Sequence, residues 1–174
     1  MAKPLPDIVA QDLSVIFAGL NPGLSSAAAA HHFSHGSTRF WKALHLSGFT
    51  PTQLRPEDDG ALPRFGLGLT TVVARPTRGG NELKSAEFVE AATDLAHHLE
   101  HLRPKCVAFL GKAAYAAIVG RRDIPWGLQP DRFGTAIVWV LPNPSGRNRA
   151  FTLNQLVQSY RDLRLFIESD ARAH

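Results

Sequence analysis

Two short segments, Asn21-Pro22-Gly23 and Asn143-Pro144-Ser145-Gly146, carry the residue types best suited to chemistry. An asparagine side chain offers both donors and an acceptor, so it can hold a water molecule or recognise an amide-like edge of a ligand. Proline stiffens the chain beside it, and glycine lets the backbone approach a ligand closely. The alternative is a pair of tight turns in which each asparagine caps its own backbone. The occurrence of two such segments supports both interpretations about equally.

Each segment directly follows a predicted buried strand. Residues 15–18 and 136–141 are short, apolar and partly β-branched, which is typical of strands covered on both faces. Residues 67–74 and 107–110 predict two further strands. In parallel sheets, ligands bind beyond the carboxyl ends of the strands. We therefore expect the two asparagine segments to face one common site.

Helices are predicted between the strands. The clearest begins at Ser85 and ends before Pro104, because its apolar residues recur at spacings of three and four. Caps and apolar spacing predict further helices at residues 38–44 after Ser37, at residues 112–119 and after Thr152, and a helix start at Thr50-Pro51.

This alternation indicates an α/β fold with three α/β/α layers and a central four-stranded, mostly parallel sheet. The length of 174 residues suits one domain, residues 1–174. Residues 1–11 and 169–174 are expected to be loose termini.

The composition limits the classes of function. A net charge of +4 and a pI of about 9.6 permit a polyanionic partner without requiring one. The one cysteine, Cys106, excludes an intrachain disulfide and a cysteine-ligated iron–sulfur cluster, and it suits a reducing cytoplasm. No stretch approaches the roughly 20 apolar residues of a membrane span. A cytoplasmic protein without a membrane segment is expected.

Other kinds of site are poorly supported. Residues 19–26 lack the lysine of a phosphate-binding P-loop and the glycine pattern of a dinucleotide fingerprint. His31, His32 and His35 fit no standard zinc spacing, which favours a polar loop over a metal site. His97 and His101 are one helical turn apart, but their positions favour a solvated face. We therefore predict neither a metal nor a cofactor.

Six motifs occur in a specific order, and they extend over most of the chain. They are Gly19–Ser26, Phe33, Arg39-Phe40-Trp41, Arg75-Pro76-Thr77, Leu110-Gly111-Lys112 and Leu141–Gly146. Together they resemble the mismatch-specific uracil-DNA glycosylase family, the bacterial relatives of thymine-DNA glycosylase within the uracil-DNA glycosylase superfamily. The resemblance implies a cofactor-free enzyme that flips uracil from double-stranded DNA in base excision repair. The main uracil-DNA glycosylase family carries an aspartate where this chain has Asn21.

The resemblance also implies roles for individual residues. Asn21 matches the catalytic asparagine that positions the attacking water, and Asn143 matches a second asparagine near the base and sugar. Phe33 matches the aromatic residue that stacks on the flipped base. Ser26 matches a pocket residue close to the base. The remaining matches are the base-binding residues Leu20 and Gly23, and the segment that enters the duplex, Ser145, Gly146, Arg147, Asn148 and Arg149.

The physical chemistry agrees with these roles. Breaking an N-glycosidic bond builds positive charge on the sugar and negative charge on the base, so a placed water and hydrogen-bond donors are needed. Asparagine cannot act as a general base near neutral pH, which predicts a slow enzyme. Flipping is cheapest at a mismatch, which favours uracil opposite guanine. Arg147 stands where the family often has a leucine wedge, and this affects how strictly guanine is required.

Several alternatives stay open. Asp58, Asp59 or Asp94 could supply the missing carboxylate, although all three suit an exposed surface. No spacing singles out Lys42, Lys84, Lys105 or Lys112 for Schiff-base chemistry, so a monofunctional enzyme is expected. Trp41, Trp126 and Trp139 are expected in or near the core, and Cys106 is expected to be inert. A non-catalytic reader of mismatched or damaged DNA and a nucleotide-binding regulatory domain are the competing functions, and a monomer is expected.

Overall fold

A five-stranded sheet forms the centre of the computed structural model, which describes residues 5–173. The strands lie in the order β2-β1-β3-β5-β4, and β2, β1, β3 and β5 are parallel. Their bounds are β1 Val15–Gly19, β2 Leu67–Thr71, β3 Cys106–Leu110, β4 Gly127–Leu128 and β5 Ile137–Leu141. The three longer apolar strands in the middle are buried on both faces, as their sequences predict.

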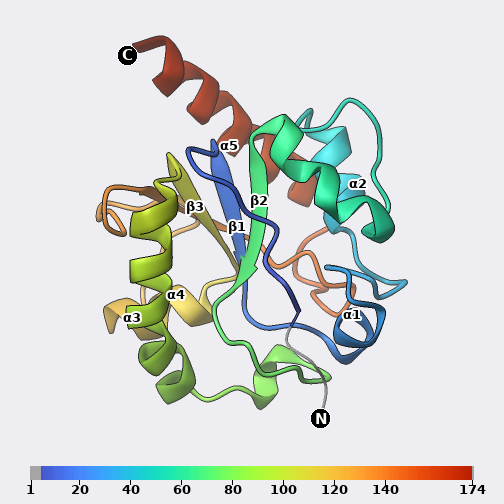
Figure 1. Ribbon diagram of the computed structural model, residues 1–174, viewed down its shortest axis with the longest axis vertical. Helices are drawn as coiled ribbons and strands as arrows, with labels where there is room; N and C mark the ends of the chain where they lie inside the picture. The colour runs from blue at the N-terminus through green and yellow to red at the C-terminus, as the bar shows by residue number, and fades with distance from the viewer. Residues whose placement is uncertain (1–4, 174) are drawn as a thin grey trace.

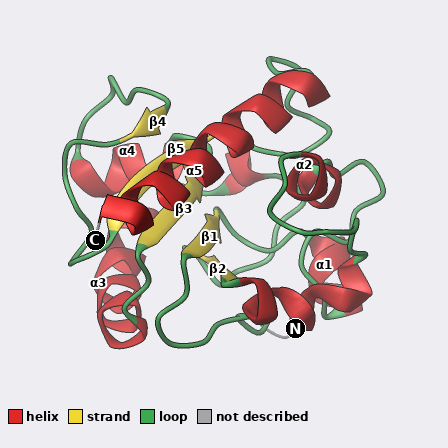
Figure 2. Ribbon diagram, turned by 90° about the horizontal axis from the view of Figure 1, so that it is seen from above, coloured by secondary structure: helices red, strands yellow, loops and turns green. Residues whose placement is uncertain are grey.

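Helices cover both faces of this sheet (Figure 1). They are α1 Leu24–Ala29, α2 Phe40–Leu46, α3 Ser85–Leu102, α4 Ala113–Val119 and α5 Leu153–Ala173, with the 3-10 helices η1 Pro56–Phe65 and η2 Gly80–Glu82. Alternate residues of β1 show the division: Phe17 packs with α2 and α5, whereas Ile16 packs with α3 and α4. Figure 2 shows α5 passing along the sheet, with α3 and α4 together to one side.

The predicted three-layer α/β/α fold is therefore confirmed, but the predicted count of four strands is wrong. The fifth strand, β4, has two residues and pairs antiparallel with the edge of β5. Gly127 has a φ of 86°, and no apolar alternation surrounds it. Such a strand exists only because β5 offers a free edge, so its own sequence could not reveal it.

The helix predicted to start at Thr50-Pro51 is also wrong. The Thr50 hydroxyl donates a 2.7 Å hydrogen bond to the carbonyl of Thr52, which closes a local turn, and helical structure begins only at Pro56. Ser37 does not cap α2, because its hydroxyl contacts Nδ1 of His35 at 2.7 Å. Thr152 does cap α5, and it exchanges hydrogen bonds of 3.2 and 2.7 Å with Gln155.

The terminal segments are more ordered than expected wherever the structure describes them. Ile8 pairs with Leu69 through two backbone hydrogen bonds of 2.9 and 2.7 Å, so the N-terminal segment is attached to β2 at this point. Residues 169–173 continue α5. Residues 1–4 and 174 lie outside the described residues. Between residues 5 and 173, no helix combines the length and the apolar character needed to cross a membrane.

Gly68 is predicted to be essential for this N-terminal contact. A Cβ at Gly68 would lie 2.7 Å from the backbone oxygen of Ile8 and 2.8 Å from Cδ1 of Leu13. Gly68→Ala should therefore lower the free energy of unfolding by about 1–3 kcal/mol in urea titrations. Gly60→Ala is the matched control, because nothing lies within 4 Å of its added Cβ. Equal stability of the two variants would contradict this packing.

Candidate active site

A cavity of about 890 Å³ opens where β1, β3 and β5 end. It brings together nearly all the residues singled out in the sequence. Those that line it are Leu20, Asn21, Gly23, Ser26, Phe33, Asn143, Ser145, Gly146, Arg147 and Asn148. Arg149 is exposed and is the one predicted residue outside the lining. The expectation that the two asparagine segments face one site is consistent with this arrangement.

The Asn21 side chain is held in one orientation. Its amide nitrogen donates to the backbone oxygen of Arg75 at 2.7 Å and to Oγ1 of Thr77 at 2.8 Å. Both amide hydrogens are thereby used, since an amide nitrogen carries two. No residue between 5 and 173 donates to Oδ1 of Asn21, and the residue lines the cavity. Asn21 therefore presents a hydrogen-bond acceptor to a ligand or water.

Asn21 is held by the Arg75–Thr77 segment, a motif whose role the sequence alone does not reveal. Thr77 forms a parallel bridge with Gly23, with hydrogen bonds of 3.1 Å from Thr77 N to Pro22 O and from Leu24 N to Thr77 O. The Thr77 hydroxyl donates to Gly79 O at 2.9 Å, so it can only accept from Asn21. The Arg75 guanidinium binds both carboxylate oxygens of Glu87 at 3.0 Å, which lowers the pKa of Glu87. These contacts fix the Arg75–Thr77 segment against the first asparagine loop.

Asn143 has the opposite polarity towards the cavity. Its Oδ1 accepts a 2.9 Å hydrogen bond from the backbone N–H of Ser145, and its backbone oxygen accepts one from the side chain of Asn148. Within the described chain, nothing accepts from Nδ2 of Asn143. Gly111 packs close by, where an added Cβ would lie 3.7 Å from Cβ of Asn143. Asn143 can therefore donate a hydrogen bond to an oxygen of a ligand in the cavity. Asn21 offers an acceptor to the same cavity.

Phe33 forms an aromatic wall of the cavity. Its ring stacks on Phe40 with centroids 4.2 Å apart and an interplanar angle of 22°, so one face is already covered. Its backbone has a φ of 52°, and its carbonyl accepts a 3.2 Å hydrogen bond from Nε1 of Trp41. Ser26 accepts a 3.1 Å hydrogen bond from the N–H of Ser34. These contacts hold the ring as a rigid surface on which a planar ligand can stack.

The histidines around Phe33 tie its loop to the rest of the fold. Asp59 of η1 accepts from the backbone N–H of His32 at 3.0 Å and contacts Nδ1 of His31 at 3.2 Å. Nε2 of His32 donates to Pro6 O at 2.7 Å. His35 is exposed, and its Nδ1 accepts from the N–H of Ser37 at 3.1 Å. Among residues 5–173 no group of three potential metal-ligating side chains occurs.

The segment predicted to enter a duplex, residues 145–149, lies at the edge of the cavity, and residues 145–148 line it. Gly146 packs so closely on Ser37 that an added Cβ would lie 2.6 Å from its backbone oxygen. The guanidinium of Arg147 reaches the β2–α3 loop, where a Cβ on Gly79 would lie 2.9 Å from Nη1. The Arg147 side chain therefore connects the 145–148 segment to the Gly79 loop, and both line the cavity.

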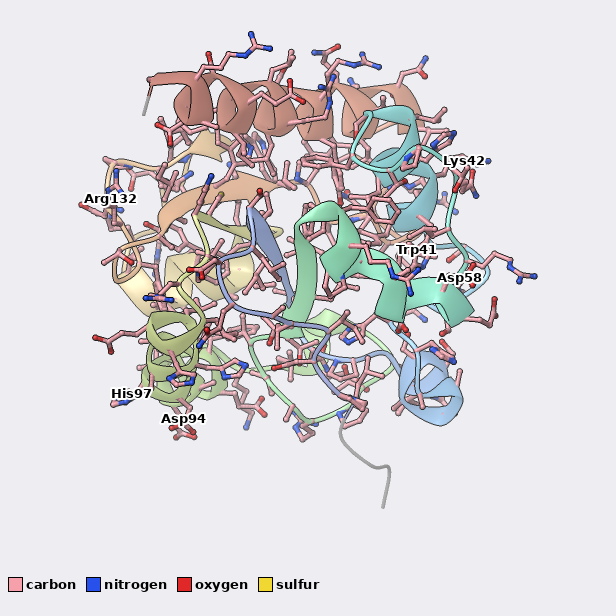
Figure 3. All side chains as sticks on the ribbon, turned by 45° about the horizontal axis from the view of Figure 1, so that its top comes forward. Trp41, Lys42, Asp58, Asp94, His97 and Arg132 are labelled. Atoms are coloured by element: carbon pink, nitrogen blue, oxygen red, sulfur yellow. The ribbon has the colours of Figure 1, made fainter. Side chains whose placement is uncertain are left out.

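The other candidate side chains lie away from this cavity. Figure 3 shows Asp94 and His97 on the outer side of α3, where both are exposed, and Asp58 on η1, where it is partly exposed. The expected surface position is wrong for Asp59, which is buried because it accepts from the backbone of His32. No lysine of the described residues lines the cavity. Cys106 is buried, which raises its pKa to about 12 and agrees with an inert thiol. Trp41 and Trp139 are buried as predicted, but the prediction for Trp126 is wrong, because its side chain is 43% exposed.

Two comparisons with known proteins bear on this site. A family model described as the Uracil DNA glycosylase superfamily matches residues 6–164. The structure is also similar to the solution NMR structure of a "putative Uracil DNA glycosylase" from Methanosarcina acetivorans. That match has a TM-score of 0.50 and 16% sequence identity, and covers 94% of this chain and 98% of the other. At this identity the structural match shows a shared fold.

The anchoring of His32 predicts a dependence of stability on pH. Burial lowers the pKa of His32 from its ordinary value of 6.5, so the unfolded chain binds a proton more readily than the folded one. The stabilisation is complete above pH 6.5 and is lost as the pH falls below it. The free energy of unfolding should therefore be lower at about pH 5.5 than at about pH 7.5. His32→Gln keeps a donor for Pro6 O and should weaken this dependence; an unchanged dependence would exclude His32 as its source.

Proposed function

Because the chain belongs to the uracil DNA glycosylase superfamily, we propose that it hydrolyses the N-glycosidic bond of uracil in double-stranded DNA, with a preference for uracil mispaired with guanine. The observation that carries the proposal is the fixed polarity of the cavity: Oδ1 of Asn21 faces it as an acceptor, and Nδ2 of Asn143 as a donor. Phe33 adds a flat aromatic surface to the same cavity. A flipped pyrimidine needs this combination of stacking and edge recognition.

The proposed reaction begins when uracil leaves the duplex and stacks on Phe33. Nδ2 of Asn143 donates to a base oxygen, where negative charge builds as the glycosidic bond breaks. Oδ1 of Asn21 accepts a hydrogen bond from a water molecule and aims its oxygen at the sugar carbon C1′. The water adds to C1′, uracil departs with the bonding electrons, and the excess proton leaves with solvent or the base. An amide does not take that proton, so the rate depends on orientation rather than on general-base catalysis.

The preference for a G·U pair follows from the cost of flipping. A base that is mismatched leaves the stack more easily than a correctly paired one. In the part of the chain that the structure describes, the lining includes no carboxylate that could act as a general base, and its charged side chains are Arg78 and Arg147. An enzyme that relies on orientation alone is therefore most effective where the duplex is already weakened.

A monofunctional reaction is the form that the lining favours. Strand cleavage by β-elimination requires an amine that attacks C1′ to form a Schiff base. The absence of lysine from the lining, within the described residues, supports hydrolysis by water and an intact strand with an abasic site. Asp58 and Asp94 lie outside the cavity and have no part in the proposed reaction.

Asn21→Ala tests the proposed role of the first asparagine. The substitution removes the acceptor that orients water, and the single-turnover rate on a G·U duplex should fall by about 10²-fold or more. Alkali treatment of end-labelled duplexes then reveals abasic sites. Asn154→Ala, an exposed position on α5, is the matched control and should keep the wild-type rate. Tight G·U binding without any uracil release by the wild type would favour a non-catalytic reader instead.

Arg147→Leu tests contact with the DNA backbone. If Arg147 neutralises one phosphate, the slope of log affinity against log salt concentration should decrease by about 0.9 in the variant. Fluorescence anisotropy of a labelled G·U duplex measures this slope. Arg132→Leu is the control, because Arg132 lies outside the cavity lining, at the edge of the molecule in Figure 3. A slope that both substitutions change equally would reflect net charge alone.

A further inference from the structure

Arg39 makes more hydrogen bonds to the insertion segment, residues 144–151, than to any other part of the chain. Its Nη1 donates to Phe151 O at 2.6 Å, and its Nη2 donates to Ser145 O at 2.9 Å and Asn148 O at 2.8 Å. Its backbone N–H also donates to Pro144 O at 2.9 Å. One residue next to α2 thus binds four backbone carbonyls of a loop more than 100 positions away in the sequence.

The insertion segment has little regular structure to hold it otherwise. It belongs to no helix or strand, and its own hydrogen bonds are short-range, such as Asn148 N to Ser145 O at 3.0 Å. The Arg39 guanidinium joins its beginning at Ser145 to its end at Phe151. The Phe151 ring in turn packs edge-on against Trp126, with centroids 5.2 Å apart. Between these ends lies Arg147, whose guanidinium extends to the Gly79 loop at the cavity.

An arginine is specifically suited to this position. The guanidinium is planar and carries five donors in a fixed fork, so it can serve several carbonyls at once. A lysine ammonium keeps the positive charge but has neither the fork nor the same reach. Replacing arginine by lysine therefore separates the geometry of the loop from simple attraction to DNA.

We propose that Arg39 is a positioning residue that preorganises the insertion segment for entry into the duplex. The inference rests on the proposed function, because it concerns the step in which the segment fills the space left by a flipped base. A preformed loop avoids the entropy cost of ordering its residues upon DNA binding. Arg39 should therefore matter for uracil within a base-paired duplex and not for uracil that is already unpaired.

The test compares two substrates in single-turnover assays with Arg39→Lys. One is a G·U duplex, and the other carries uracil in a short unpaired loop between two duplex arms. The variant should lose about tenfold on the G·U duplex and keep nearly the wild-type rate on the unpaired uracil. Arg164→Lys is the matched control: Arg164 donates to Ser47 O at 2.7 Å and binds Glu168 at 2.8 Å, outside the cavity lining. It should leave the ratio of the two rates unchanged.

Two results would overturn the proposal. An equal loss of rate on both substrates would mean that Arg39 only supports the fold. No loss of rate on either would mean that the insertion segment does not need Arg39.

If wild-type protein releases no uracil from either substrate, the proposed function fails, and amide hydrogen exchange tests the role of Arg39 separately. The amides of Asn148 and Ala150 should then exchange faster in Arg39→Lys than in wild type and in Arg164→Lys; unchanged exchange would contradict the role. If Arg39→Lys does not fold, Arg39→Gln, which buries no charge, replaces it in all assays.

Discussion

The parallel register of β1, β3 and β5 is the constraint on which the site depends. Val15 of β1 lies level with Cys106 of β3, which lies level with Ile137 of β5, so the strands end together. Neighbouring strands are about 4.8 Å apart, which places the ends of β1 and β5 roughly 10 Å from each other. That separation suits a nucleobase held between two loops. A shift of either strand by one residue would turn its buried side chains to the opposite face and displace its loop.

In the proposed reaction, the site acts through orientation rather than through a charged catalytic group. Two amides face the cavity, one as an acceptor and one as a donor, and each is fixed by hydrogen bonds at its other end. Those bonds come from Thr77, Arg75 and Ser145, none of which needs to touch a substrate through its side chain to be important. The rigidity of Phe33 has a similar origin, because Phe40 and Trp41 hold its ring and its carbonyl. Much of the site's function therefore resides in its supporting residues.

The sequence allowed the layers, the four longer strands and the two asparagine loops that line the cavity to be predicted, because these depend on apolar periodicity and on loops that follow strands. Its failures have a common cause. β4 depends on the edge of β5, and the position of Trp126 depends on Phe151 and Lys112, which meet it only in the folded chain. Thr77 and Arg39 act on Asn21 and on backbone carbonyls far away in sequence. Both residues belong to motifs in the sequence, but no local pattern shows which distant atoms their side chains contact.

The hydrogen bonds of Asn21 also constrain how the protein can evolve. The Arg75 carbonyl lies 2.7 Å from the amide nitrogen of Asn21 and can only accept a hydrogen bond. An aspartate at this position, as in the main uracil-DNA glycosylase family, would place an ionised oxygen against that carbonyl. Thr77 could adapt by turning its hydroxyl, at the expense of its bond to Gly79, but the carbonyl could not. A lineage that exchanged this asparagine for a carboxylate would also have to change the conformation of the Arg75–Thr77 turn. A site with asparagine and a site with aspartate therefore differ by coordinated changes in two loops, not by a single substitution.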